Sequence, residues 1–344
     1  PPPPPPPTPR IECRRQRQMC IRDSEYYQTS ETAEFLDEDL LGIGNVADKV
    51  SQSFDEFWNA REACPVNDLR PPLSDDRTRE VIDRARAVIA EPRAQHYIDT
   101  LDVDFAERIV AGGIQLNHAA VDVVYDVHEK IRSFSRKSAT RTSIYLQQLV
   151  TGAGQEVVIV SPYFVPQRRG VDFLSALVHK GVRVVVITNS LASTNHSSVH
   201  AAYARYRKPL LRQGVELYEL SSRLLDESGL AIAGQKLPLH SKLAIVDGSK
   251  AFVGSFNLDP RSLFLNTEMG LGVECAPLAQ EIVEAVLHSI PSLGYRLGMT
   301  GRSRLTWTRE VEGATTVYRS EPETRFLRRI TTRLLGLLPI ESQM

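Results

Sequence analysis

The strongest constraint on the fold is a stretch in which two short apolar segments flank a tight-turn dipeptide. Residues 243–246 are all apolar, Asp247 and Gly248 follow, and residues 251–253 are apolar again. An aspartate–glycine pair between two apolar runs is typical of a β-hairpin. The sequence therefore predicts a strand–turn–strand over this stretch.

Four polar residues lie at the open end of this predicted hairpin. His240 and Lys242 are two positions apart, so on a strand they point to the same face. Ser255 and Asn257 follow the second strand, and the turn returns them to the level of the first pair. An imidazole, an ammonium, a hydroxyl and an amide in one place suit phosphoryl chemistry. The histidine would attack phosphorus or pass a proton, and the other groups would hold charged oxygens.

The complete spacing is more specific than any one of its residues. A lone histidine on a strand is usually a core residue and a lone lysine a solvated one, but here the stretch reads H-x-K-x4-D-x6-G-S-x-N from His240 to Asn257. It resembles the HKD motif of the phospholipase D superfamily. Residues 160–166, 265–271 and 337–341 are similar to the bacterial cardiolipin synthase C-like branch, and this resemblance covers most of the chain from residue 25 onward.

The resemblance implies a reaction through a phosphohistidine. In such proteins two HKD motifs face one another, one histidine attacks phosphorus, and the other protonates the leaving oxygen. By resemblance, His240 is the general acid/base. Glu268 is expected to orient the far ring nitrogen of His240 and so to fix its tautomer.

The same resemblance assigns the other residues of the motif. Lys242 and Asn257 are expected to bind phosphate oxygens, with Ser255 assisting. Asp247 and Gly254 are expected to be structural. Because lysine, amide and protonated imidazole supply the positive charge, neither a metal nor another cofactor is expected.

A second group of candidates lies between residues 196 and 207. His200, Tyr203 and Arg207 follow the pattern V-H-A-x-Y-x-x-Y-R, which the family carries near its site, and they are candidate substrate-binding residues. The alternative is a helix that packs its aromatic face into the core. His196 and His200 are four residues apart, as in a metal-binding pair, but no third ligand accompanies them.

An internal repeat supplies a further candidate. Residues 35–44 are predicted to form an acidic-to-apolar strand followed by a helix from Asn45, and the same order recurs from Glu268 into a helix starting near Pro277. In this register Asp37 occupies the place of Glu268, with Asp39 as the less favoured choice. Asp37 therefore joins the candidate substrate-binding residues.

Alternation of strands and helices predicts the fold class. Strands are expected at residues 121–125, 156–160, 182–188 and 214–218, and helices at residues 77–89, 138–150, 171–179 and 199–212. Residues 156–160 form a continuous apolar run, which is typical of a strand buried on both faces. We predict an α/β fold: a phospholipase D-like duplicated sandwich with mixed, mostly parallel sheets flanked by helices and an incomplete first repeat.

The chain divides into four predicted segments. Residues 1–24 are a non-native or disordered leader, residues 25–135 a remnant of a first phospholipase D-like repeat, residues 136–300 the second repeat with the HKD motif, and residues 301–344 a C-terminal extension. His128 and Lys130 repeat the H-x-K spacing, but Ser135 stands where the motif requires aspartate. The loop at residues 126–130 also departs from the Asp-x-Pro-x-Lys expected there, so a phosphate-binding role for it is doubtful.

A basic amphipathic helix is predicted over residues 324–338. Its arginines mark one side and its apolar residues the other. Two interpretations stay open. The arginines could face anionic lipid head groups, or the helix could dock on the sheet as an ordinary terminal helix.

Composition limits the function classes. At 42% apolar residues and a formal net charge of −1, the chain has a substantial core and lacks the basic field of a dedicated nucleic-acid binder. No run of about 18 apolar residues is present, which excludes a spanning segment of that kind. Four cysteines without metal-ligand spacing imply neither a disulfide framework nor a zinc site.

The sequence thus predicts a phosphatidyltransferase of the cardiolipin synthase type, peripheral to a bacterial membrane. Its expected partners are phosphatidylglycerol-like phospholipids, with phosphatidylethanolamine as a further candidate, and an anionic membrane surface; no nucleic acid is expected. Two alternatives are a phosphodiesterase or nuclease with the same chemistry, and an inactive fragment, since only one complete HKD motif is present. On that ground residues 25–344 alone are expected to show negligible transfer. The membrane side and the oligomeric state stay open.

Overall fold

The structure is a computed structural model that describes residues 35–100, 105–114, 116–131, 140–222, 238–301, 304–311 and 313–338. The predicted leader at residues 1–24 lies outside these ranges. The helices of the described residues are α1 (Asn45–Trp58), α2 (Val66–Leu69), α3 (Asp75–Ile89), α4 (Pro92–Thr100), α5 (Phe105–Val110), the 3-10 helix η1 (His128–Ile131), α6 (Arg141–Thr151), α7 (Gln167–His179), α8 (Ser197–Ala204), α9 (Arg207–Arg212), α10 (Pro260–Phe264), α11 (Ala276–Leu293) and α12 (Phe326–Leu335).

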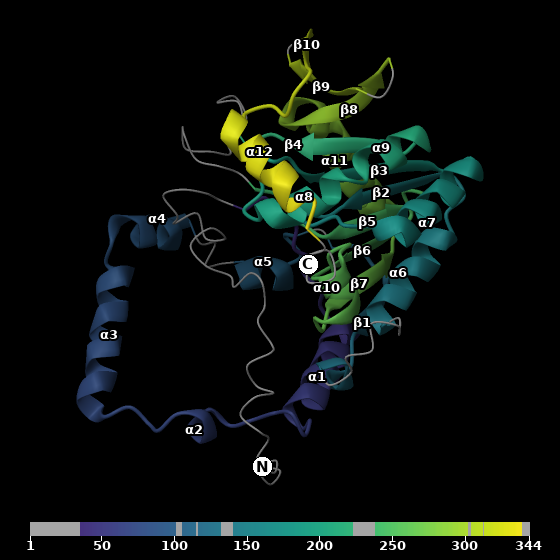
Figure 1. Cartoon of the computed structure of the whole chain (residues 1–344). Coiled ribbons are helices and arrows are strands. Elements are labelled where there is room, and N and C mark those ends of the chain that lie inside the picture. Colours follow the sequence, from purple (N-terminus) through teal and green to yellow (C-terminus); the bar gives the residue numbers. More distant parts are fainter. Residues whose placement is uncertain are drawn as a thin grey trace.

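The described strands form one ten-stranded mixed sheet in the order β1-β7-β6-β5-β2-β3-β4-β8-β9-β10 (Figure 1). The strands are β1 (Ala120–Tyr125), β2 (Glu156–Val160), β3 (Arg183–Asn189), β4 (Glu216–Leu220), β5 (Leu243–Val246), β6 (Lys250–Gly254), β7 (Met269–Glu274), β8 (Gly294–Thr300), β9 (Arg304–Val311) and β10 (Ala314–Tyr318).

The predicted α/β class, with a mixed sheet flanked by helices, is confirmed, but the described strands are not mostly parallel as expected. Among the described strands, β2, β3 and β4 are parallel neighbours, and every other neighbouring pair is antiparallel. Short connections account for three of these antiparallel pairs. Turns of a few residues join β5 to β6, β8 to β9 and β9 to β10, and such short turns can join only antiparallel neighbours.

Helices cover both faces of the central strands. Along β2, Val157 and Ile159 belong to a core formed with α7, α8 and α9. Val158 and Val160 belong to a second core on the other face, formed with α11. Successive side chains of a strand point to opposite faces, so burial of all four confirms that β2 is covered on both sides.

Most predicted elements are present, with ends shifted by a few residues, but two predictions were wrong. The helix predicted over residues 199–212 is divided into α8 and α9, since Pro209 lacks an N–H and its ring crowds the carbonyl of Arg205. Residues 35–44 form no strand apart from a single bridge between Leu36 and Leu239. That segment contains three acidic residues and two glycines, which are residue types poorly suited to strands.

The last three strands were not predicted. β8 pairs with β4, and β9 and β10 continue the sheet beyond it. The predicted boundary between residues 300 and 301 therefore falls inside the β8–β9 hairpin. The other internal boundary, between residues 135 and 136, lies outside the described residues.

The N-terminal helices lie largely outside this body. α1 packs along β1, whereas α2, α3 and α4 extend away from the sheet (Figure 1). α3 is exposed along its whole length. Ser74 caps its first turn by accepting a hydrogen bond from the Arg77 N–H, and ion pairs three or four residues apart, such as Arg77–Glu80, follow its surface.

Candidate active site

The β5–β6 hairpin forms the frame of the site, and the predicted strand–turn–strand is confirmed. Leu243 pairs with Val253 and Val246 with Lys250. The turn residues Asp247 and Gly248 have positive φ values of 52° and 56°, a backbone region that aspartate tolerates and glycine adopts freely.

Asp247 ties this turn to the start of β2. Its carboxylate accepts hydrogen bonds of 2.8 Å from the backbone N–H groups of Gly154, Gln155 and Glu156. Although burial alone would raise the pKa of Asp247, these three bonds lower it. The contacts support the structural role predicted for Asp247.

His240 lies just before β5 and contacts the segment at residues 35–37. The His240 backbone N–H donates to the Leu36 carbonyl at 2.8 Å, and His240 Nδ1 lies 2.8 Å from Asp37 Oδ2. The Phe35 ring packs against the imidazole with centroids 4.9 Å apart. Burial alone would raise the pKa of Asp37, but the hydrogen bond and the charges of His240 and Lys242 lower it.

Lys242 stands beside the imidazole. Its Nζ lies 3.1 Å from both ring nitrogens of His240 and donates a short hydrogen bond to the His240 carbonyl oxygen. Both side chains are mostly buried. Three predicted residues, His240, Lys242 and Asp37, are therefore in direct contact.

The carboxylate 2.8 Å from Nδ1 of His240 is Asp37, so the orienting role predicted for Glu268 stays a prediction that no described contact supports. Glu268 instead accepts a 2.5 Å hydrogen bond from the Ser255 hydroxyl, which also accepts from the Met269 N–H at 3.0 Å. Burial raises the pKa of Glu268. The pairing of the backbone segments explains where these two carboxylates lie. The bridge between Leu36 and Leu239 carries Asp37 to the imidazole, whereas the β6–β7 pairing holds Glu268 beside Ser255.

Gly254 and Asn257 complete the motif. Gly254 pairs with Gly270 across β6 and β7, and a Cβ at Gly254 would lie 2.4 Å from the Met269 carbonyl oxygen, so only glycine fits. The Asn257 N–H donates to Ser262 Oγ at 3.2 Å. Within the described part of the chain, the buried Asn257 Oδ1 has no hydrogen-bond partner, which leaves its carboxamide with unused hydrogen-bonding capacity.

A buried ion pair between Lys130 and Asp126 holds the backbone at Glu268 in place. Lys130 donates to the Asp126 carboxylate at 2.6 Å and to the Ser262 carbonyl at 2.8 Å. Asp126 also accepts from the backbone N–H groups of Thr142 and Glu268. These contacts give the loop at residues 126–130 a structural role, in agreement with the doubt about phosphate binding there.

Asn189 is a positioning residue that sequence reasoning missed. At the end of β3, its side chain donates to the Leu239 carbonyl at 3.0 Å and accepts from the Leu239 N–H at 2.9 Å. This pair of bonds fixes the backbone that enters His240. An asparagine at the carboxyl end of a buried strand was the available signal, since ligand-binding and positioning residues gather at such ends.

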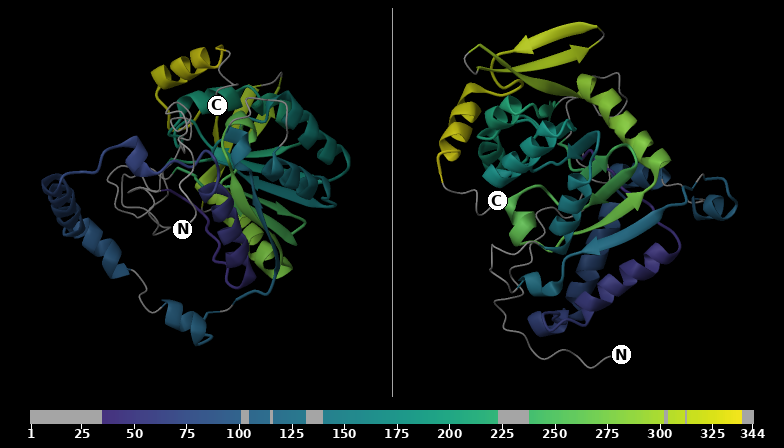
Figure 2. Two further views of the ribbon diagram at one scale, coloured as in Figure 1. Left: turned by 90° about the horizontal axis from the view of Figure 1, so that it is seen from below. Right: turned by 90° about the vertical axis from the view of Figure 1, so that its right-hand side faces the viewer.

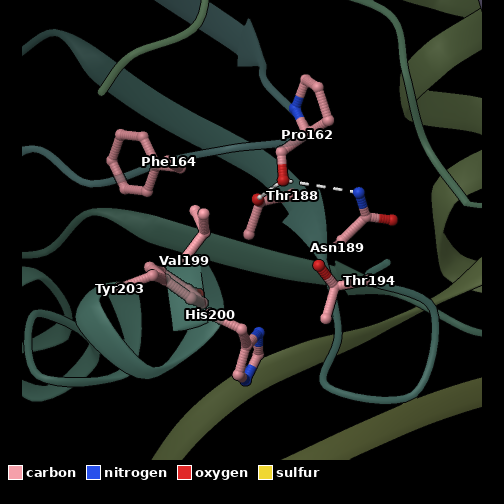
Figure 3. Close-up of a pocket in the computed structure, with 8 residues that line it drawn as sticks. All are labelled: Pro162, Phe164, Thr188, Asn189, Thr194, Val199, His200 and Tyr203. Carbon is pink, nitrogen blue, oxygen red and sulfur yellow. Dashed lines mark hydrogen bonds between the residues drawn. The ribbon is translucent and has the colours of Figure 1, made fainter. Parts of the chain in front are cut away.

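His200 and Tyr203, two of the predicted substrate-binding residues, line a small pocket next to Asn189 (Figure 3). The pocket is lined by Pro162, Phe164, Thr188, Asn189, Thr194, Val199, His200 and Tyr203. Asn189 connects this pocket to Leu239 and so to the backbone of His240. A role of His200 and Tyr203 in substrate binding stays a prediction.

Arg207, the third predicted substrate-binding residue, lies at the centre of a buried ionic network. It holds Glu219 through two hydrogen bonds of 2.7 and 3.0 Å and Glu321 through one of 2.6 Å. Its NH2 group also lies 2.7 Å from His200 Nε2. Burial and the charge of Arg207 lower the pKa of His200. Because these protein groups occupy its guanidinium, substrate contact by Arg207 stays a prediction that no contact supports.

Two features are absent from the described residues. No group of three or more histidine, cysteine, aspartate or glutamate side chains within them is arranged to hold a metal ion. None of the helices that the structure describes is long and apolar enough to cross a membrane.

The chain is similar to known proteins over most of its length. Residues 146–288 match the family described as "Cardiolipin synthase, PLD-like domain". Cardiolipin synthase C of Escherichia coli K12 is 34% identical over 329 residues, which cover 92% of this chain and 67% of that protein. An uncharacterized protein of Helicobacter pylori is 26% identical over 315 residues, or 91% of this chain and 62% of that one.

Among solved structures, phosphatidylserine synthase of Haemophilus influenzae gives a TM-score of 0.41 at 14% identity, covering 64% of this chain and 46% of that one. The chain spans about two thirds of the length of the curated relatives described above. Sequence identity and the matching family model define the class as phospholipase D-like. The chain belongs to the cardiolipin synthase family of phospholipase D-like enzymes.

Proposed function

We propose that the protein transfers phosphatidyl groups between phospholipids, with His240 as the general acid/base. The observation that carries this proposal is the contact of His240 with both Asp37 and Lys242. A histidine oriented by a carboxylate and flanked by an ammonium is suited to proton transfer beside a phosphate.

Asp37 determines which ring nitrogen does the chemistry. A carboxylate at Nδ1 holds the proton on that nitrogen, so Nε2 is the atom that exchanges a proton with the substrate. Lys242 Nζ lies 3.1 Å from Nε2, which places a positive charge where a phosphate oxygen would approach.

Each step of the proposed reaction exchanges one bond to phosphorus for another. A second histidine attacks phosphorus of phosphatidylglycerol, the bond from phosphorus to the glycerol oxygen breaks, and His240 gives that oxygen its proton. His240 then takes the proton from a hydroxyl of a second phosphatidylglycerol as that oxygen attacks the phosphohistidine. The products are cardiolipin and free glycerol.

The remaining motif residues hold the phosphate during this exchange. Lys242 and the Asn257 carboxamide bind its non-bridging oxygens, and Ser255 assists from the hydrogen bond that it makes with Glu268. These positive and neutral donors are strongest in a partly buried site, because the low local dielectric strengthens charge interactions.

The substrate class places the protein at a membrane surface. We infer a peripheral location on a bacterial membrane with phosphatidylglycerol as donor and acceptor, and phosphatidylethanolamine as a further candidate. The sequence identity to a cardiolipin synthase supports this inference.

The experiment that tests the function compares two substrates on one preparation, in which the chain is supplied with the second HKD motif that the two-histidine reaction requires. The same preparation is the parent in every activity assay below. Phosphatidylglycerol vesicles should yield cardiolipin and glycerol in equal amounts, whereas labelled single-stranded DNA should be left intact. Hydrolysis of the DNA without cardiolipin formation would replace this proposal by a nuclease of the same superfamily.

A further inference from the structure

The C-terminal helix α12 docks on the body through its polar side. Arg328 donates hydrogen bonds to the Thr194 carbonyl at 3.1 Å and to Ser197 Oγ at 3.4 Å, both next to the start of α8. Thr332 is buried, and a Cβ at Gly336 would lie 3.2 Å from the Ala201 carbonyl oxygen. α12 therefore rests against α8 with an arginine, a threonine and a glycine in the contact (Figure 1).

The apolar side of α12 faces outward. Phe326, Leu327, Leu334 and Leu337 are 69%, 74%, 58% and 81% exposed, and Ile330 lies between them on the same face. Figure 2 shows the helix at the outer margin of the molecule in both views. Together these side chains present several hundred Å² of apolar surface, a size at which an exposed patch marks an interaction site.

This arrangement reverses the usual one. A surface helix normally turns its apolar side to the core and its charged side to water. In this docked orientation Arg328 is used for contacts within the chain. An ordinary packing role for α12 would not leave its leucines in water.

The charges around the apolar face suit an anionic lipid surface. No acidic residue occurs from residue 324 to residue 338, although the whole chain has a formal charge of −1. Arg325 and Arg333 are exposed near the two ends of the helix. An apolar stripe bordered by arginines is the pattern of a helix that lies in the membrane interface.

We propose that α12 lies in the plane of the membrane interface with Phe326, Leu327, Leu334 and Leu337 among the acyl chains. The proposal deepens the proposed function, on which the choice of lipid as occupant rests. Arg328 connects α12 to Thr194, which lines the same pocket as Asn189. Asn189 in turn holds the backbone of Leu239, the residue before His240.

The test measures binding to vesicles of phosphatidylcholine and phosphatidylglycerol by sedimentation. In the variant Leu327→Glu/Leu334→Glu, the partition coefficient should fall about tenfold or more, because two apolar side chains are replaced by charges. The matched control is Val66→Glu/Leu73→Glu, whose parent residues are 70% and 58% exposed near α2, away from α12 (Figure 1). The control should bind within twofold of the parent, and circular dichroism confirms that both variants fold.

Failure of the membrane proposal and failure of the proposed function give different results. Unchanged binding by the α12 variant would overturn the proposal, even if the protein transfers phosphatidyl groups. Binding that depends on α12 in a protein without transfer activity would leave the proposal standing and remove the proposed function. A lipid-free dimer that the α12 variant converts to a monomer, with vesicle binding unchanged, would assign this face to a second copy and overturn the proposal.

Discussion

Replacement of Asp37 by asparagine tests whether this carboxylate orients the catalytic imidazole. The side-chain amide keeps the size of the group and can still accept a hydrogen bond from His240 Nδ1, now 2.8 Å from the carboxylate, but it removes the negative charge. A hydrogen bond to a charged group contributes about 1.5–3 kcal/mol. If that energy acts on the protonated imidazole in the transition state, kcat should fall about 10- to 100-fold.

The assay is the rate of cardiolipin formation from phosphatidylglycerol at saturating lipid. The matched control is Asp39→Asn, which changes an exposed acid two residues away in the same segment and should keep kcat within about twofold of the parent. A kcat for Asp37→Asn that stays within threefold of the parent would refute the orienting role. Equal losses in both variants would show that the segment, rather than Asp37, is responsible.

The same variant has a signature in stability. Contacts with His240 and Lys242 lower the folded-state pKa of Asp37 below its ordinary value of 3.8. A carboxyl group with a lowered pKa stabilises the fold above its unfolded-state pKa and loses that contribution as the pH falls through the folded-state value. The parent should therefore be more stable than Asp37→Asn at neutral pH, and the difference in unfolding free energy should shrink below about pH 4.

Three further predictions concern the motif and its supports. Lys242→Arg should lower kcat by about 100-fold or more, since a forked guanidinium cannot replace a compact ammonium beside the imidazole; near-parental turnover would contradict this. Burial raises the pKa of Asp259 to about 6, so the charged form costs stability above that pH. Asp259→Asn keeps the cap on Ser262 and should stabilise the protein by up to about 3 kcal/mol at pH 8 but not at pH 4, measured by urea unfolding. Arg207→Met should lower the unfolding free energy by about 3–5 kcal/mol because the buried Glu219 loses its cationic partner and keeps only neutral donors such as Trp307, whereas a loss under 1 kcal/mol would refute the structural role.

The local parts of the site could be predicted from the sequence. The β5–β6 hairpin rests on a turn dipeptide and two apolar runs, all within residues 243–253. The same holds for β2, whose continuous apolar run indicates burial on both faces. These signals lie within a few neighbouring residues, so contacts with distant parts of the chain did not change the predicted elements.

The carboxylate at His240 could not be assigned in this way. Asp37 and His240 are 203 residues apart, and their contact depends on a single bridge between Leu36 and Leu239. Glu268 follows the motif closely and matched the expected residue type, yet the β6–β7 register directs it to Ser255. Sequence spacing shows which acids are candidates, but the choice between them requires the relative position of two distant segments.

The orientation of α12 was unpredictable for a related reason. Its period shows a basic side and an apolar side, and both sides could dock. The decision came from α8, where the Thr194 carbonyl and Ser197 offer acceptors that an arginine can satisfy and a leucine cannot. Strands β8 to β10 were missed in the prediction for another reason. They combine polar and apolar residues, in place of the continuous apolar run that indicated β2.

The central claim is that His240 is the acid/base of a phosphatidyl transfer. The most direct measurement is cardiolipin formation from phosphatidylglycerol by His240→Ala, compared with His128→Ala in the same preparation. His128 is the matched control because it also stands two residues before a lysine, Lys130, but lies outside the motif. We predict loss of detectable transfer in His240→Ala, with a parental melting temperature, and transfer within about threefold of the parent in His128→Ala. Transfer by His240→Ala within a few-fold of the parent would contradict the claim.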